Sequence, residues 1–133
     1  MDAMRTLIAG AIASALLLVL DAALGILGGL VGTRLFGLPV SQLEPSKMKL
    51  GLVFEVINGF MLAIIYALIQ PALAGQGWTK GVPYGLMVWG LRVVMWAFST
   101  YMMTNLPPTQ IAITTVTGLL EMLIICTAIA AIY

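Results

Sequence analysis

Residues 7–30 read LIAGAIASALLLVLDAALGILGGL, a run of 24 residues whose one charged side chain is Asp21. A helix rises about 1.5 Å per residue and the hydrocarbon layer of a bilayer is about 30 Å thick, so a run of this length can cross the layer as a helix. The run is continuous rather than alternating, which favours a helix over a barrel strand. We therefore predict a transmembrane helix that carries a carboxyl group inside the membrane.

Three further runs of the same kind follow along the chain. They contain 21, 21 and 23 residues, at about 50–70, 83–103 and 110–132. Each again has one charged side chain, and these are Glu55, Arg92 and Glu121. The predicted fold class is all-α: an integral membrane four-helix bundle that forms one transmembrane domain over residues 1–133. Four crossings in up-down-up-down order place both termini on the same side of the membrane.

The composition agrees with a chain that is surrounded by lipid. Hydrophobic residues make up 62% of it and charged residues 8%, whereas a soluble domain contains about 25% charged residues. Six basic and five acidic side chains cannot form a water-facing surface, so the lipid bilayer is the expected environment. We predict a multi-pass protein of a bacterial inner membrane or a plasma membrane.

Several classes of chemistry lack the residues they need. The chain has no histidine, which removes the commonest metal ligand and the usual general base. Its one cysteine, Cys126, cannot form an intramolecular disulfide or a redox pair. The net charge of +1 does not provide the basic surface that binding of nucleic acid requires. We expect no metal and no cofactor, and we predict that the protein is not an enzyme.

The connections between the spans are short and only weakly define the orientation. The first, at about 31–49, carries Arg34, Lys47 and Lys49, against Arg5 and Lys80 on the other side. The positive-inside rule then slightly favours a cytoplasmic first connection. The start of the chain resembles a signal peptide, but its apolar run continues past the length of a signal core, so we expect it to be retained as the first span.

Small residues at four-residue intervals predict where helix backbones approach closely. The pairs include Gly25 with Gly29, Gly59 with Ala63, and Gly81 with Gly85. Such spacing is typical of helix–helix contacts in lipid. We expect Gly25, Gly29, Gly59 and Gly85 to act in helix packing, within the bundle or against another chain.

The four intramembrane charges are the main lead to a function. A charge near a helix centre costs roughly 2.5–3.5 kcal/mol on insertion scales, so these side chains should face inward. Arg92 and Glu121 each lie roughly 13–16 Å into adjacent antiparallel spans, which makes them the expected pair. Asp21 and Glu55 are expected to approach each other or Arg92. Three acids and one base leave a surplus of negative charge, so one or more acids should hold a proton.

Other polar and aromatic residues extend this cluster. Trp89, Arg92 and Trp96 follow each other at i, i+3 and i+7, so both indole rings are expected to shield the guanidinium by cation–π contact. Asn58, one turn after Glu55, is expected to hydrogen-bond across helices. The threonines at the start of the fourth span are expected to bond back to their own helix or to a neighbour: Thr114, Thr115 and Thr117.

The size and four-span plan resemble those of small multidrug-resistance transporters, which work as antiparallel dimers around a membrane-embedded carboxylate. The resemblance covers the architecture alone, because no stretch of this chain reproduces that family's sequence pattern. It implies a transport function and assigns no residue.

Two functions of different classes fit these observations. The first is a non-catalytic accessory or scaffolding subunit of a larger membrane assembly, with other membrane chains or further copies of itself as partners. The alternative is a small oligomeric transporter or channel that uses Asp21, Glu55, Glu121 and Arg92 for proton or ion coupling. A solvated cavity that reaches the acids favours the alternative, whereas a dry and fully paired interior favours the first.

Overall fold

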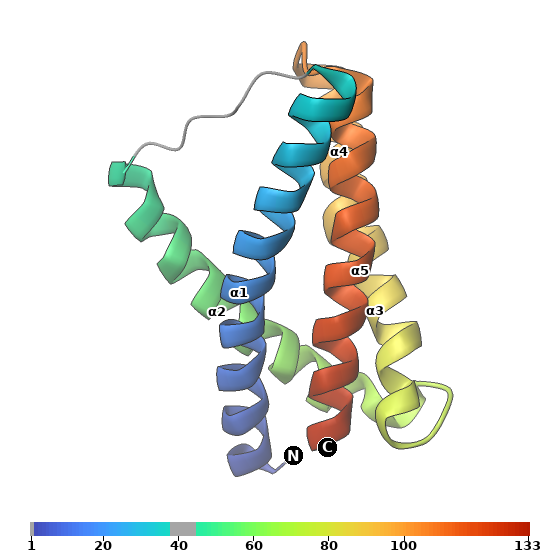
Figure 1. Cartoon of the computed structure of the whole chain (residues 1–133). Helices are drawn as coiled ribbons and strands as arrows, with labels where there is room; N and C mark the ends of the chain where they lie inside the picture. The colour runs from blue at the N-terminus through green and yellow to red at the C-terminus, as the bar shows by residue number, and fades with distance from the viewer. Residues whose placement is uncertain (1, 38–44) are drawn as a thin grey trace.

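The computed structural model describes residues 2–37 and 45–133, and these residues form helices joined by short turns (Figure 1). The α-helices are α1 (Ala3–Phe36), α2 (Pro45–Ile69), α3 (Gly81–Trp89), α4 (Met95–Met103) and α5 (Pro108–Ile132). A π-helical turn, η3 (Gly90–Val94), joins α3 to α4 in one continuous span. Two short 3-10 helices, η1 (Gln70–Ala72) and η2 (Gly77–Lys80), lie between α2 and α3.

Four segments of this structure are long and apolar enough to cross a membrane. They run over Ala3–Leu35, Lys47–Ala72, Gly77–Met103 and Pro108–Ile132. The predicted all-α membrane fold with four spans is therefore confirmed. The order of up and down crossings stays a prediction. Residues near the two ends of the chain do meet, because Arg5 Nη1 donates to the Tyr133 carbonyl at 3.1 Å, and both ends lie at the same end of the molecule (Figure 1).

The first two helices extend beyond the predicted spans. Helix α1 continues to Phe36 and α2 begins at Pro45, because a helix can run on past the hydrocarbon layer through polar residues that hydropathy assigns to a connection. Arg34 lies in the last turn of α1, where a cation complements the helix dipole. Gly37 follows with φ of 64°, the left-handed conformation in which glycine commonly ends a helix. Residues 38–44 of the predicted connection lie outside the described residues.

Most of the buried core lies in the half of the bundle that contains the two termini. Tyr66 and Tyr84 pack edge to face with ring centroids 5.2 Å apart, and the Tyr84 hydroxyl donates to the Leu62 carbonyl at 2.7 Å. The core draws on four helices, with Ala9, Ala13 and Leu17 from α1, Leu62, Ala63 and Tyr66 from α2, Tyr84 and Val88 from α3, and Met122, Ile125, Cys126, Ile129 and Ala130 from α5.

Two of the four predicted packing glycines lie at close approaches between helices. A Cβ on Gly59 of α2 would collide with the side chain and backbone of Ser14 of α1, whose hydroxyl donates to the Val56 carbonyl at 2.9 Å. A Cβ on Gly85 of α3 would lie 3.1 Å from the Met122 carbonyl of α5. Small residues are typical of such contacts between transmembrane helices, because they allow the two backbones to approach closely.

Gly25 and Gly29 of α1, which were also expected to act in helix packing, do not lie at such a contact. A Cβ on either glycine would meet nothing within 4 Å among the described residues. The predicted packing role of these two glycines is therefore not seen inside the bundle. The same four-residue spacing leaves this pair open because both glycines line a cavity.

Substitution by alanine should lower the stability at one of these glycines and not at the other. Gly59→Ala forces α1 and α2 apart and should lower the free energy of unfolding by about 1–3 kcal/mol, the usual cost of overpacking. Gly29→Ala meets open space and gains helix propensity, so its stability should be unchanged or higher by up to about 1 kcal/mol. Unfolding of both variants in mixed micelles by a denaturing detergent measures the difference. Equal losses for the two variants would contradict the assigned contacts.

Candidate functional site

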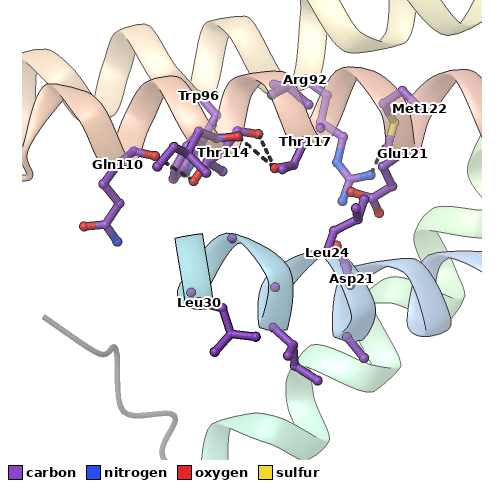
Figure 2. A pocket seen from close by; sticks show the side chains of 18 of the residues that line it. Asp21, Leu24, Leu30, Arg92, Trp96, Gln110, Thr114, Thr117, Glu121 and Met122 are labelled. Atoms are coloured by element: carbon purple, nitrogen blue, oxygen red, sulfur yellow. Dashed lines mark hydrogen bonds between the residues drawn. The ribbon is translucent and has the colours of Figure 1, made fainter. Parts of the chain in front are cut away.

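A cavity of about 1040 Å³ occupies the half of the molecule that the core leaves open. It lies between the second half of α1 and the first half of α5, with walls from η3, α4 and one residue of α2, Phe54. Its polar lining residues are Asp21, Thr33, Arg92, Gln110, Thr114, Thr117 and Glu121, and Figure 2 shows several of them between α1 and α5. The predicted charge cluster therefore adjoins an open cavity rather than a filled interior.

Arg92 stands on η3 and is held chiefly by helix α2. Its Nη2 lies 3.4 Å from Glu55 Oε1 in an ion pair. With its amide oxygen turned toward the guanidinium, Asn58 accepts hydrogen bonds from Nη2 at 2.8 Å and from Nη1 at 3.0 Å. Nη1 also lies 3.9 Å from the sulfur of Met122. One carboxylate and one amide thus compensate a guanidinium that is only partly buried.

The expected Arg92–Glu121 pair is wrong, and the start of α2 explains why. We predicted a span that begins near residue 50, which places Glu55 at a shallow depth. Helix α2 begins at Pro45, and Glu55 therefore lies ten residues into it, roughly 15 Å along its axis. Glu55 thus reaches the same depth as Arg92 and takes the role that the sequence assigned to Glu121. The expected cross-helix hydrogen bond of Asn58 is made to Arg92 itself.

Glu121 is buried and lacks a full set of partners. Its side chain is 8% exposed, and its Oε1 atom has no hydrogen-bond partner among the described residues. Two acidic groups, Asp21 and Glu55, and one basic group, Arg92, lie close enough to act on it electrostatically. Figure 2 shows Asp21 of α1 and Glu121 of α5 facing each other at the inner end of the cavity. Of these two acids Glu121 is the buried one, whereas Asp21 is exposed.

The two tryptophans of the third span do not act as a pair. Trp89 donates from Nε1 to the Thr115 carbonyl at 2.9 Å, which braces α3 against α5. Trp96 is 46% exposed and lines the cavity. In the described parts of the chain the ring contacts are between tyrosines, and neither indole makes a cation–π contact with Arg92. The π-helical turn lies between them and rotates the later residues, so the i, i+3, i+7 stripe of a regular helix is not maintained.

Threonines on α5 are functional candidates that the sequence analysis noted only as structural. Thr114 and Thr117 donate their hydroxyl protons back to the Gln110 and Ile113 carbonyls, both at 3.0 Å, as expected. They also line the cavity. The signal was present in the sequence, because Gln110, Thr114, Thr117 and Glu121 share one helical face at i, i+4, i+7 and i+11. This face leads from the cavity mouth to the buried carboxyl group.

Comparison with known proteins gives no match to a family model, to a curated protein or to a solved structure. The interpretation of the site therefore rests on its own geometry and chemistry.

Neutralising the two glutamates should separate their roles. Glu55→Gln removes the anion that faces Arg92 and should lower the free energy of unfolding by about 1–3 kcal/mol, less than for a fully buried pair because both side chains retain some exposure. Glu121→Gln breaks no ion pair of the described residues and should cost clearly less. Detergent-unfolding midpoints of the two variants provide the comparison. A larger loss for Glu121→Gln would contradict the observed pairing.

The cavity should admit water-soluble reagents. The native thiol of Cys126 is buried and serves as its own control, because it should not react. A Thr117→Cys variant places a second thiol on the cavity wall and should react with a charged methanethiosulfonate reagent. In sealed vesicles the reaction should occur from one side of the membrane only. Labelling is followed by mass spectrometry, and a Thr117→Cys variant whose new thiol stays unlabelled would indicate that the cavity is closed to water.

Proposed function

We propose that this protein is a small membrane transporter that admits a cation to the acidic groups near the middle of its helices. The observation that carries the proposal is the cavity of about 1040 Å³ that reaches Asp21, Arg92 and Glu121. Ionisable residues inside transmembrane segments usually mark substrate, ion or proton pathways. A bacterial inner membrane or a plasma membrane is the proposed location.

The charges of the cluster favour a cation over an anion. Asp21, Glu55 and Glu121 face a single guanidinium, and Arg92 already has Glu55 and Asn58 as partners. The surplus acid is thus concentrated on Asp21 and Glu121, at the inner end of the cavity. A cation or a proton that enters there offsets this surplus, whereas an anion adds to it.

The packing of the other half supports a carrier rather than an open pore. Beyond the acids, the side chains of Leu17, Tyr66, Tyr84 and Ile125 are fully buried against one another. A cavity on one side of the acids and a packed core on the other is the arrangement expected of one state of an alternating-access protein. A continuous path then requires the helices to rearrange, and the irregular turn η3 is a suitable place for such a change.

Transport can be tested on the purified protein in liposomes. Gradients of H⁺, Na⁺, K⁺ and simple ammonium salts are applied in turn, and internal pH and membrane voltage are followed with dyes. The native protein should move at least one of these cations faster than protein-free vesicles. Asp21→Asn and Glu121→Gln should each slow this flux by about tenfold or more, the effect of losing one hydrogen bond to a charged group.

Asp2→Asn is the matched control for Asp21→Asn. Asp2 is exposed at the opposite end of the molecule and pairs there with Arg5, so its substitution should leave the flux unchanged. Native protein that moves none of these cations would count against the proposal.

The accessory-subunit function remains the second candidate, and helix α2 provides its specific support. The first half of α2 leans away from the other helices in Figure 1 and exposes Leu50, Val53 and Ile57 at 73%, 57% and 56%. Another membrane chain or a further copy could cover this face in place of lipid. A single stable species, pure and active in the flux assay, would argue against a dependent subunit, whereas a stoichiometric second chain in a native preparation would support it.

A further inference from the structure

We propose that the ligand of the cavity is a protonated primary amine with an apolar body, bound with its ammonium group between Asp21 and Glu121. This inference deepens the proposed transport function and rests on it for its biological role, but binding can be measured without transport. The starting observation is an orphaned atom: Oε1 of Glu121 is buried without a hydrogen-bond partner among the described residues, on a side chain that is 8% exposed and lines the cavity.

A buried carboxyl oxygen without a partner is costly, and it marks a place that a donor can fill. Leaving a buried acceptor unsatisfied costs roughly 1–3 kcal/mol, and more for a charged group. Asp21 faces the same point from helix α1, so two carboxyl groups converge on one small volume (Figure 2). An ammonium group has three donors and one positive charge, which can serve both acids at once.

The threonine hydroxyl groups of the wall also act as acceptors. The hydroxyl protons of Thr33, Thr114 and Thr117 are donated to the carbonyls of Gly29, Gln110 and Ile113 of their own helices. Each oxygen therefore keeps lone pairs but no free proton for a ligand. The guanidinium of Arg92 directs its two terminal nitrogens at Glu55, Asn58 and Met122. Gln110, near the mouth, the Trp96 indole and the Arg92 Nε–H group still carry N–H donors, whereas the threonine and carboxyl oxygens of the wall are acceptors that favour a ligand rich in N–H groups.

The remaining wall fits an apolar body. Gly25 and Gly29 of α1 leave space that no described atom occupies within 4 Å of a Cβ position, and Leu24, Val93 and Ile113 complete this surface. From Glu121 to Gln110 the wall of α5 spans eleven residues, roughly 16 Å. An alkyl or aryl group that extends from the acids toward the mouth can remain in contact with this surface. A bare metal ion is less suited, because the described residues contain no group of three His, Cys, Asp or Glu side chains arranged to hold one.

Binding is tested with the full-length protein in lipid nanodiscs and three hexyl compounds. Hexylammonium offers charge, donors and a tail; hexyltrimethylammonium keeps the charge and the tail but has no N–H donor; hexanol has the tail without the charge. Trp96 lines the cavity, so its fluorescence reports binding, and a Trp96→Phe variant identifies its share of the signal. Protein-free nanodiscs measure partitioning into lipid, and calorimetry gives the affinity independently of tryptophan.

Hexylammonium should bind saturably and at least about tenfold more tightly than either of the other compounds, because only it satisfies both acids. Glu121→Gln and Asp21→Asn should each weaken it by about tenfold or more, whereas Asp2→Asn should not. Gly29→Leu fills the apolar wall and should weaken binding without loss of stability, which keeps the test informative if an acid variant folds poorly.

Three results would overturn the inference. Hexanol that binds as tightly as hexylammonium would indicate an apolar cavity that a lipid chain fills. Equal affinity for the trimethyl compound would show that N–H donors are not recognised, and unchanged binding to folded Glu121→Gln would remove the carboxyl group from the site. Amine binding without any flux would leave this inference standing and contradict the proposed transport, whereas flux of an inorganic cation without amine binding would do the reverse.

Discussion

The structure depends on the compensation of one guanidinium inside an apolar bundle. Arg92 cannot be left alone at that depth, and helix α2 compensates it with a carboxylate and an amide one turn apart, Glu55 and Asn58. Because Arg92 pairs with Glu55 of α2, it does not form the expected ion pair with Glu121 of α5. A buried acid with an orphaned oxygen is thus a direct consequence of where the arginine finds its partner.

The two halves of the molecule solve the packing problem in different ways. In the half with the termini, small residues such as Ala9, Ala13 and Gly59 let the backbones approach, and tyrosines fill the remaining space, with the Tyr84 hydroxyl bonded to a backbone carbonyl. In the other half α1 and α5 form walls of the cavity. The glycines of α1 there remove side chains from a wall rather than bring helices together. Similar sequence signals therefore produce a tight contact in one place and an open surface in another.

The π-helical turn connects the packing to the site. A regular helix over residues 83–103 would carry Trp89, Arg92 and Trp96 on one face, and the two rings would then enclose the guanidinium. With η3 inserted, Trp89 braces α5 through the Thr115 carbonyl and Trp96 faces the cavity, while Arg92 is free to reach α2. Such turns are frequent at functional sites because they redirect side chains without breaking the helix. No residue pattern in the chain signals the turn, so its effect on the site could not be foreseen.

The sequence by itself determined the lipid environment, the four helical spans and the identity of the four charges within them, because length, hydropathy and the cost of burying a charge are local properties. For the threonines of α5 the sequence left open whether they bond to their own helix or to a neighbour, and in the structure Thr114 and Thr117 donate to carbonyls of α5 itself. Only the tertiary structure decided that Arg92 pairs with Glu55, that Gly25 and Gly29 face a cavity, and that Glu121 lies at its end with an oxygen unpartnered among the described residues. These features depend on where helices begin, how they diverge and where one turn changes its winding. Such quantities arise from contacts between segments far apart in the chain, and no single span contains the information that sets them.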